Sequence, residues 1–572
     1  MNFDEGRKIR RALITSTVLI PLLFLSPAFA SVSGTSTSSI TSAPLLNAAT
    51  VQHTVTLLDP KFDPLTGGVP FCLSLSRGTV TCYPPSFLKK AYNFPSTKGE
   101  NGLDGSGSTV VIVDAFGSPT IQADLNLFDT TFGLPATTVT RLCGPTWTGA
   151  PTDVCPVNTI ADLSTAPNAA LCGATGWAEE TTLDVTMVHG LAPGAKIYLA
   201  VANDCFDQSL TAAEMAVVSQ HSLRGSIMSQ SFGEPDDLVG CLTVNANNQC
   251  TSTDPTIKAN ADKVYARAAD NHWTVIASSG DDGANTDARV LGTGELTPSW
   301  PATNPQNLAA GGTQGSPYGG QYGAPPGPGG TFSCAAHATC NTGLVLVNGG
   351  ATGCKTAFRP GEPSSCTPIG YGGESAWNEF TVFGLGTSTG GGVSMLYDRP
   401  SYQAALPHKF PTLLGSSVKA DGRMTPDVSF NSAIMGGVLA PLSFLGPAGS
   451  SNPPFPQWAV FGGTSAAAPA WAAIIALANQ ANDGPLGFIN PAIYAMMQGD
   501  NQGNNQGNNH GDSSGGAGSF HDITTGENSD TAGQFGVDGF KASKGYDLTT
   551  GWGTPDVSQF IQDIPNFTGG NN

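Results

Sequence analysis

The sequence predicts an α/β protein with a doubly wound, mostly parallel sheet, helices on both faces and long loop insertions. Strand-like and helix-like runs alternate along the chain, as a doubly wound sheet requires. The 572 residues can bury a large core, and 72 glycines and 42 prolines indicate many loops.

The alternating runs follow in a regular order. Strands are expected over 107–116, 195–202, 226–232 and 274–280, and helices over 211–220 and 257–272. Segment 315–373 is rich in Gly, Pro and Cys, and 500–519 contains NQGNNQGNNHG. Both are expected to be loop insertions.

The N-terminal 30 residues have the pattern of an export signal. Basic residues at 7–11 precede an apolar run over 12–25, and Ala28-Phe29-Ala30 offers a cleavage site. We expect a signal peptide over 1–30 and a secreted protein; an uncleaved anchor is the alternative. Residues 31–81 form a short N-terminal segment, an abbreviated propeptide, and the main domain is expected over 82–572.

Twelve cysteines fit export, because oxidising compartments allow disulfide bonds. Proximity alone suggests the pairs Cys72/Cys82, Cys143/Cys155, Cys172/Cys205, Cys241/Cys250, Cys334/Cys340 and Cys354/Cys366.

An acidic pair lies in GWAEETTLDVTMVHGLAPGA. Glu180 and Asp184 are four residues apart, so a helix places them on one face. A solvated acidic face is the ordinary interpretation. Because Leu183 and Val185 make the helix apolar, the carboxylates are instead expected at a partly buried edge, where burial and repulsion raise at least one pKa.

Asp281 follows a short buried strand in VIASSGDDGA. Catalytic groups of open α/β sheets collect at such strand ends. A turn aspartate bonded to its own backbone is the alternative, and Asp282 is a competing candidate.

A hydroxyl nucleophile is indicated by FGGTSAAAPAWAAIIALANQ. Gly462 and Gly463 permit close approach, and Thr464 and Ser465 suit the start of a buried helix. An N-cap serine before a core helix is the structural alternative.

Together these segments resemble the sedolisins, or serine-carboxyl peptidases, which are subtilisin-like in fold and act in acid. The matching pieces run from about Cys82 onward and include EETTLDVTMVHGLAPGA, SSGDDGA, SWPATNPQNLAAGGT, GGGVSMLYDRPSYQ, RMTPDVSF, GGTSAAAP and GYDLTTGWG. The resemblance places the family's nucleophile on Ser465, its Glu-x-x-x-Asp pattern on Glu180 and Asp184, and its oxyanion-stabilising aspartate on Asp281. Sedolisins are usually made with a long folded propeptide, and about fifty residues are too few for one.

The implied chemistry is peptide hydrolysis through an acyl-enzyme. Ser465 attacks the carbonyl, Glu180 is the general base and Asp184 orients it. A protonated Asp281 donates a hydrogen bond to the oxyanion, so activity is expected to be lost toward neutral pH. Ser229 and Ser231 are expected either to line the cleft, where substrate adds as a strand, or to serve in turns.

Other functions stay open. A subtilisin-type neutral protease needs an early aspartate and a histidine, for which Asp114 and His189 are candidates, but no His-Gly-Thr-His motif is present. His189 is therefore interpreted as a packing or surface residue. A catalytically inactive secreted homologue is the third possibility. An esterase that uses the same serine is disfavoured because Gly-Thr-Ser-Ala around Ser465 lacks the Gly-x-Ser-x-Gly elbow.

One calcium ion is implied by FHDIT and KASKGYDLTTGWG, which resemble the family's C-terminal calcium loops. The resemblance assigns side-chain oxygens of Asp522 and Asp547 and carbonyl oxygens of Ile523, Ser543 and Gly545. Oxygen ligands suit a hard cation. Two turn aspartates without metal are the alternative.

The charge balance limits the partners. A net charge of -19 with 24 basic residues argues against nucleic acid. We expect protein or peptide substrates, cleaved by an endopeptidase or a tripeptidyl-peptidase. We also expect a monomer without stable membrane association after signal cleavage.

Overall fold

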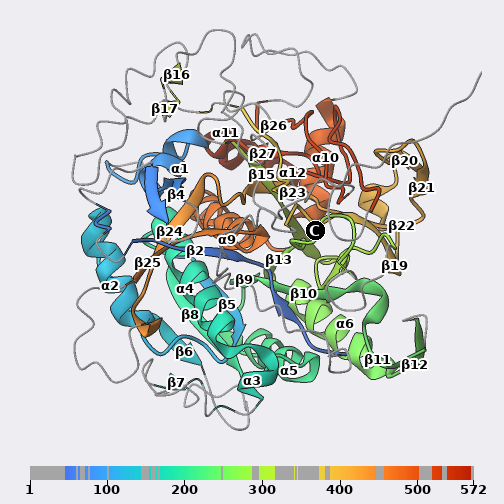
Figure 1. Ribbon diagram of the computed structural model, residues 1–572, viewed down its shortest axis with the longest axis horizontal. Helices are drawn as coiled ribbons and strands as arrows, with labels where there is room; N and C mark the ends of the chain where they lie inside the picture. The colour runs from blue at the N-terminus through green and yellow to red at the C-terminus, as the bar shows by residue number, and fades with distance from the viewer. Residues whose placement is uncertain are drawn as a thin grey trace, which may run out of the picture. The chain divides into compact units, whose positions relative to one another are not determined.

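Alternating strands and helices form the centre of the protein (Figure 1). The structure is a computed structural model in which everything described belongs to one unit, Gly34–Asn572. The residues described are 46–59, 62–64, 71–74, 78–99, 102–142, 154–155, 163, 166, 168–245, 249–286, 295–315, 340–341, 344–345, 371, 373–379, 387–445, 457–500, 518–530 and 537–568. The expected signal peptide, the alternative anchor, and most of the two expected insertions lie outside them.

The central sheet has nine strands and is mostly parallel, as predicted. Its order is β18 (Ser375–Ala376), β15 (Asn307–Gln314), β13 (Thr274–Ser278), β9 (Ile227–Gln230), β5 (Thr109–Ala115), β8 (Lys196–Ala202), β6 (Thr140–Leu142) and β7 (Val154–Cys155). β23 (Val428–Asn431) also pairs with β15 in parallel. β18 and β7 are antiparallel edge strands.

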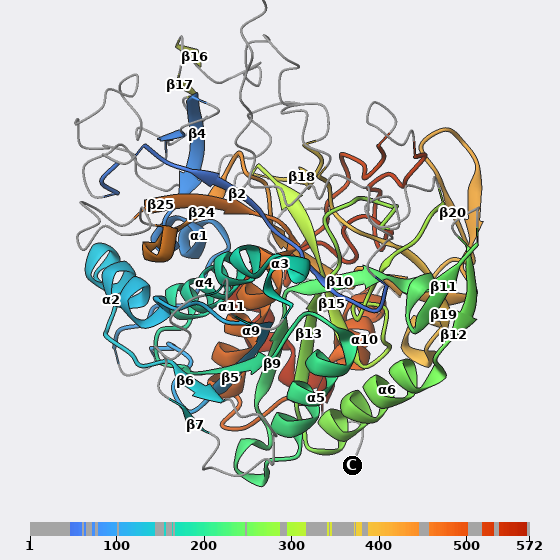
Figure 2. The ribbon, with the colours of Figure 1, turned by 60° about the horizontal axis from the view of Figure 1, so that its bottom comes forward.

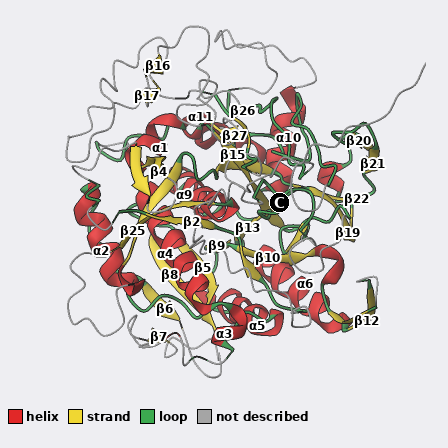
Figure 3. Ribbon diagram, viewed as in Figure 1, coloured by secondary structure: helices red, strands yellow, loops and turns green. Residues whose placement is uncertain are grey.

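Helices cover both faces of this sheet (Figure 3). α4 (Ala174–Leu191) and α9 (Thr464–Ala481) pack together and against β5, while α5 (Asp207–Val218) and α6 (Pro255–Asp270) pack together and contact β8 and β13. The side chains of β5 show why both layers are needed. Val110 and Ile112 join the apolar cluster around α9, whereas Val111 and Val113 join the cluster around α5 and α6. A strand buried on both faces is typical of a parallel sheet.

A second sheet brings the N-terminal part of the described chain against the main domain. Its order is β2 (Thr54–Leu57), β25 (Gln457–Gly462), β24 (Gly437–Leu442), β4 (Gly78–Tyr83) and β3 (Phe71–Ser74). Just before β2, β1 (Thr50–Val51) pairs antiparallel with β10 (Phe232–Pro235). Residues 50–57 therefore cross from β10 to β25, as the blue segment in Figure 2 shows.

The remaining elements connect and flank the two sheets. Helices are α1 (Pro85–Ala91), α2 (Ile121–Phe132), α3 (Ala169–Cys172), α10 (Asn490–Asp500), α11 (Val557–Asp563) and α12 (Pro565–Thr568). Strands are β11 (Cys241–Val244), β12 (Cys250–Thr253), β14 (Ser299–Trp300), β16 (Cys340–Asn341), β17 (Leu344–Val345), β19 (Gly392–Asp398), β20 (Lys409–Pro411), β21 (Ser417–Lys419), β22 (Gly422–Thr425), β26 (Phe520–His521) and β27 (Thr554–Pro555). Among the helices in the described ranges, none combines the length and apolarity that crossing a bilayer requires.

Three of the six predicted disulfides are present. They join Cys72 to Cys82, Cys172 to Cys205 and Cys241 to Cys250. Each of the other three predicted pairs has at least one cysteine outside the described residues. The Cys72–Cys82 bond connects β3 and β4, the hairpin that follows β2 in the chain.

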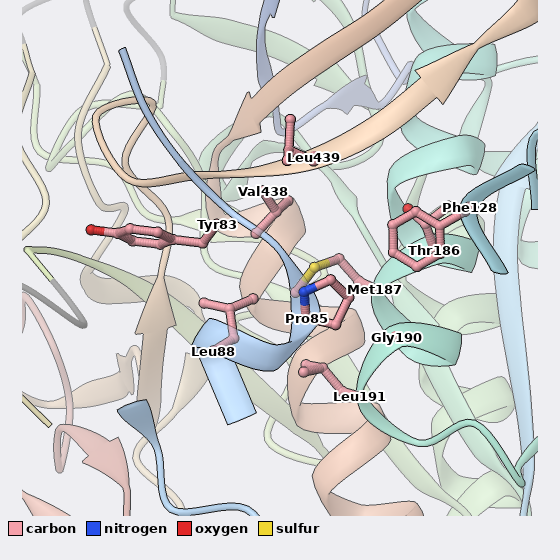
Figure 4. Close-up of a pocket in the computed structure, with 10 residues that line it drawn as sticks. All are labelled: Tyr83, Pro85, Leu88, Phe128, Thr186, Met187, Gly190, Leu191, Val438 and Leu439. Carbon is pink, nitrogen blue, oxygen red and sulfur yellow. The ribbon is translucent and has the colours of Figure 1, made fainter. Parts of the chain in front are cut away.

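A pocket lies among α1, α2, α4 and β24 (Figure 4). It is lined by Tyr83, Pro85, Leu88, Phe128, Thr186, Met187, Gly190, Leu191, Val438 and Leu439. None of the predicted catalytic or metal-binding residues belongs to this mostly apolar lining. The pocket is therefore distinct from the candidate site.

A buried ion pair joins the helical layer to the central sheet. Both terminal nitrogens of Arg423 donate to the Asp427 carboxylate, and both side chains have zero exposed area. Asp427 also accepts hydrogen bonds from the Ala309 N–H of β15, at 2.8 Å, and from the Tyr494 hydroxyl of α10, at 2.7 Å. The ion pair thus links β22, which contains Arg423, to β15 and α10.

We expect Asp427→Ala to lower the free energy of unfolding by about 3–5 kcal/mol, because it leaves a buried guanidinium without its counter-charge. The matched control is Asp421→Ala, whose ion pair with Lys419 is exposed. Its effect should stay below about 1 kcal/mol. Chemical denaturation followed by tryptophan fluorescence measures both, and equal small effects would contradict the prediction.

Candidate active site

Ser465 is the second residue of α9. It follows Gly463, where the backbone passes close to Gln52 and Asp281. Gly463 has a φ of 111°. A β-carbon there would lie 2.4 Å from the Gln52 carbonyl oxygen and 2.6 Å from Asp281 Oδ2, so only glycine fits. The helix behind Ser465 is buried over nearly its whole length. The serine is therefore held at a fixed helix start, as predicted.

Asp281, in the loop that follows β13, fixes this helix start. Its Oδ1 accepts hydrogen bonds from the Thr464 N–H at 2.7 Å and from Thr464 Oγ1 at 2.8 Å. Because both bonds arrive at Oδ1, a proton on the Asp281 carboxyl group would be carried by Oδ2, the oxygen beside Gly463. Asp281, and not the competing Asp282, makes these contacts to α9.

Glu180 and Asp184 lie on α4 with no exposed area, so they are more deeply buried than the expected helix edge. Asp184 Oδ1 accepts a hydrogen bond from Ser231 Oγ at 2.9 Å. Ser231 also contacts Ser465: its hydroxyl donates to the Ser465 carbonyl, and its own carbonyl accepts from Ser465 Oγ, both at 3.4 Å. Ser231 thus connects Asp184 to Ser465. Between Glu180 and Ser465 themselves, no hydrogen bond forms among the described residues.

Asp114, at the end of β5, adds a third buried carboxylate that the sequence did not assign to this group. Burial, and then the charge of Glu180, raise the pKa of Asp114 well above its ordinary value, although Thr181 and His53 oppose the shift. Burial, followed by the charges of Asp114 and Glu180, likewise raises the pKa of Asp184. The cluster therefore retains protons well above the pH at which an exposed aspartate ionises.

Gln52 and His53 also reach the site, although no sequence motif marks them. The Gln52 carbonyl accepts the Ser465 N–H at 3.0 Å, and Gln52 Oε1 accepts the Asp281 N–H at 3.0 Å. His53 Nδ1 lies 2.6 Å from Glu180 Oε2, and its Nε2 lies 3.4 Å from Glu179 Oε2. Burial disfavours the imidazolium, but Glu180 and Glu179 outweigh it and raise the pKa of His53 to about 10.

His189 is a packing residue, in agreement with its interpretation from the sequence. It is fully buried on α4, where Nε2 lies 3.0 Å from Asp129 Oδ1 of α2 and 2.9 Å from the Pro135 carbonyl. It therefore pairs with a different aspartate from the one that a subtilisin-type triad would use, Asp114.

The two predicted calcium loops lie side by side. Asp522 Oδ2 accepts the Gly545 N–H at 2.9 Å, and Asp547 Oδ2 accepts the Ser543 N–H at 2.7 Å. Within the described ranges, the carbonyl oxygens of Ile523, Ser543 and Gly545 accept no hydrogen bond. No three His, Cys, Asp or Glu side chains of those ranges converge on one point. A cation here would therefore depend on carbonyl oxygens as well as the two carboxylates, a donor set that suits Ca²⁺.

Residues 167–515 match the model of the subtilase family, which is more than half of the chain. The chain belongs to this family. Within it, the similarities place the chain among the sedolisins. It is 27% identical over 486 residues to kumamolisin from Bacillus sp. (strain MN-32), covering 85% of this chain and 64% of that protein. It is 25% identical over 387 residues to sedolisin from Pseudomonas sp. (strain 101), covering 66% and 48%.

Further relatives share shorter stretches with this sedolisin-family chain. Tripeptidyl-peptidase 1 from Bos taurus is 31% identical over 229 residues, which cover 36% of this chain and 34% of that protein. This chain thus spans about one third to just under two thirds of the relatives' length. The solved structure of Pseudomonas sedolisin, a serine-carboxyl proteinase complexed with two molecules of pseudo-iodotyrostatin, superposes with a TM-score of 0.54 at 22% identity. The superposition covers 86% of this chain and 99% of that one, and it confirms the subtilisin-like fold.

The raised pKa of Asp114 predicts how stability depends on pH. Above the ordinary aspartate pKa of about 4, the folded state binds more protons at Asp114 than the unfolded state. This group's contribution to the free energy of unfolding therefore falls as pH rises. Asp114→Asn should make the free energy of unfolding depend less steeply on pH between about pH 4 and about pH 7.

Denaturant titrations at several pH values across this range measure the slope of the free energy of unfolding against pH. Asp421→Asn, at an exposed position, should keep the wild-type slope. Equal slopes for Asp114→Asn and wild type would show that Asp114 titrates normally in the folded protein.

Proposed function

We propose that this protein is a serine-carboxyl peptidase that hydrolyses peptide bonds through an acyl-enzyme. The hydrogen bond from the Ser465 N–H to the carbonyl oxygen of Gln52 carries the proposal. It places a peptide carbonyl at the nucleophilic serine and beside Asp281, where an oxyanion would need a donor.

Each buried side chain then has a role in the reaction. Ser465 Oγ attacks the carbonyl carbon while Glu180 takes the hydroxyl proton and later gives it to the leaving amine. Asp184, hydrogen-bonded to Ser231, orients the base and shares protons with it. Asp281, protonated on Oδ2, donates to the developing oxyanion.

These groups can carry out the proposed reaction only at acid pH. A carboxylate base is most effective near its own pKa, and Asp281 can donate only while it is protonated. At neutral pH an ionised Asp281 would repel the oxyanion. The activity is therefore expected to be confined to acid pH.

A subtilisin-type mechanism is less well supported. It needs a neutral histidine that accepts the serine proton. His189 pairs with Asp129, and the raised pKa of His53 keeps that imidazole protonated at acid and neutral pH. Neither histidine suits the role of base.

The substrates are proteins or peptides, as the names of the relatives tripeptidyl-peptidase 1 and serine-carboxyl proteinase suggest. The export signal and the three disulfides support secretion. We also propose one Ca²⁺ held by Asp522, Ile523, Ser543, Gly545 and Asp547. The ion would join the two C-terminal loops and so stabilise the fold.

Ser465→Ala and Glu180→Gln should each lower kcat/KM by about 10⁴-fold or more, since they remove members of one catalytic unit. Asp281→Asn should lower kcat by about 10²–10³-fold. The release of peptides from denatured casein, measured from acid to mildly alkaline pH, tests these values.

The control for Asp281→Asn is Asp282→Asn, which changes the neighbouring carboxylate that does not contact Thr464. It should keep most of the activity. A neutral optimum that survives Glu180→Gln would overturn the proposed mechanism and favour the subtilisin type.

Added Ca²⁺ should raise the Tm, because binding to the folded state alone stabilises it by about 2.7 kcal/mol at a concentration 100 times Kd. Asp522→Asn and Asp547→Asn should lose most of this response, while Asp538→Asn, in a neighbouring loop, should keep it. Differential scanning calorimetry with a chelator and then with excess Ca²⁺ measures the difference. An unchanged response in both ligand variants would contradict the assignment.

A further inference from the structure

The position of His53 marks the leaving side of the candidate active site. The carbonyl of the preceding residue, Gln52, accepts the Ser465 N–H at 3.0 Å, and the Gln52 N–H donates to the Ser231 carbonyl at 3.3 Å. On either side, β1 and β2 hold the backbone extended by pairing with β10 and β25. A substrate with its reacting carbonyl at this position would follow the same extended path. Its next side chain would then lie where the His53 side chain lies.

Two carboxylates and one aromatic ring surround this side chain. His53 Nδ1 lies 2.6 Å from Glu180 Oε2, and Nε2 lies 3.4 Å from Glu179 Oε2. The imidazole also faces the ring of Phe461 on β25, with the ring centroids 5.7 Å apart. Only 3% of the His53 side chain is exposed. We call the space bounded by Glu179, Glu180 and Phe461 the leaving-side subsite.

Glu179 depends on the occupant of this subsite for its counter-charge. Among the interactions of the described residues, His53 is its one hydrogen-bond and ion-pair partner. The Glu179 side chain is 10% exposed, so water compensates it little if His53 leaves. A nearly buried carboxylate without a partner is costly, and an incoming cation would remove that cost.

We propose that Glu179 makes the enzyme select a cationic side chain, that of arginine, lysine or protonated histidine, directly after the peptide bond that it cuts. This inference rests on the proposed peptidase activity and deepens it by naming the class of substrate. His53 demonstrates the interaction, because its ring spans from one carboxylate to the other. Phe461 adds an aromatic face, which also attracts a cation.

Selection by Glu179 is compatible with the role of Glu180 as base. A cation bound to Glu180 alone would favour its ionised form and compete with the serine proton for it. Glu179, one position earlier on α4, supplies a second anion at the far end of the subsite. A long side chain such as arginine can direct its guanidinium to Glu179, where a carboxylate accepts it through two parallel hydrogen bonds. Glu180 is then left to the hydroxyl of Ser465.

The first test compares two peptides that differ only in the charge of one side chain. Arginine and citrulline have nearly the same shape, but only arginine is charged. With arginine directly after the cut bond, kcat/KM should be about 10–100-fold higher than with citrulline, as expected for a hydrogen bond between charged groups. Glu179→Gln should bring this ratio to within about 3-fold of one, whereas the control Asp282→Asn should keep the wild-type ratio. Competition from residues 50–57 affects both peptides equally and cancels in the ratio.

A third peptide tests whether the selection is local to the subsite. Arginine placed one residue further along should give no advantage, because successive side chains of an extended chain point to opposite sides. Mass spectrometry of the products locates each cut. The net charge of -19 could attract any cationic peptide. An equal advantage at both positions, or an advantage that survives Glu179→Gln, would therefore overturn the assignment to Glu179.

The His53 imidazole gives a readout that does not depend on catalysis. In Ser465→Ala, NMR titration of the histidine side chains should show the pKa of His53 raised to about 10. Adding Glu179→Gln should lower that pKa, because one of the two anions that stabilise the imidazolium is removed. The variant His53→Gln assigns the resonance. An unchanged pKa would overturn the contact on which the inference depends.

Casein hydrolysis, measured in the same samples, separates this inference from the proposed function. Hydrolysis of casein that depends on Ser465, with an arginine-to-citrulline ratio near one, would overturn the selectivity and leave the peptidase intact. No hydrolysis of casein or of any of the peptides would overturn both.

Discussion

The hydrogen bonds from Thr464 to Asp281 fix the geometry on which the site depends. They tie the first residue of α9 to the loop after β13, so the helix cannot rotate without breaking two short bonds to a buried carboxylate. A buried acceptor that loses its donors costs about 1–3 kcal/mol, or more if charged. This constraint directs the Ser465 N–H at the Gln52 carbonyl and leaves Asp281 Oδ2 beside it.

The burial of α9 and α4 makes this arrangement rigid and also sets its electrostatics. Both helices pack within one apolar cluster, so Glu180, Asp184 and Asp114 have almost no access to water. In such surroundings neighbouring carboxylates cannot all remain ionised, and the protons stay within the group. The apolar packing that stabilises the fold therefore also raises the pKa of Asp114 and of Asp184.

Local patterns in the sequence could predict much of this arrangement. The four-residue spacing of Glu180 and Asp184 was sufficient to place them on one helix face, and the apolar run before Asp281 was sufficient to place that residue at a strand end. Asp114 was visible as a polar residue ending a buried strand, but which neighbours it meets depends on the order of strands in the sheet.

Gln52 and His53 could not be predicted, because they reach Ser465 through pairing between segments about 400 positions apart in the chain, such as β2 with β25. The alternation of side chains within a short strand does not indicate which other strand it pairs with. Their places in the site are known only once both sheets are assembled.

The continuity of β2 with the hairpin β3–β4 gives the candidate active site a tethered segment. A tethered peptide has an effective concentration set by its linker, on the order of millimolar for short flexible linkers, and dilution does not lower it. A peptide from solution must displace β2 from β25 against this constant competition, whereas on the β10 side it competes with the two-residue β1. The two sides of Ser465 would thus differ in accessibility to such a peptide.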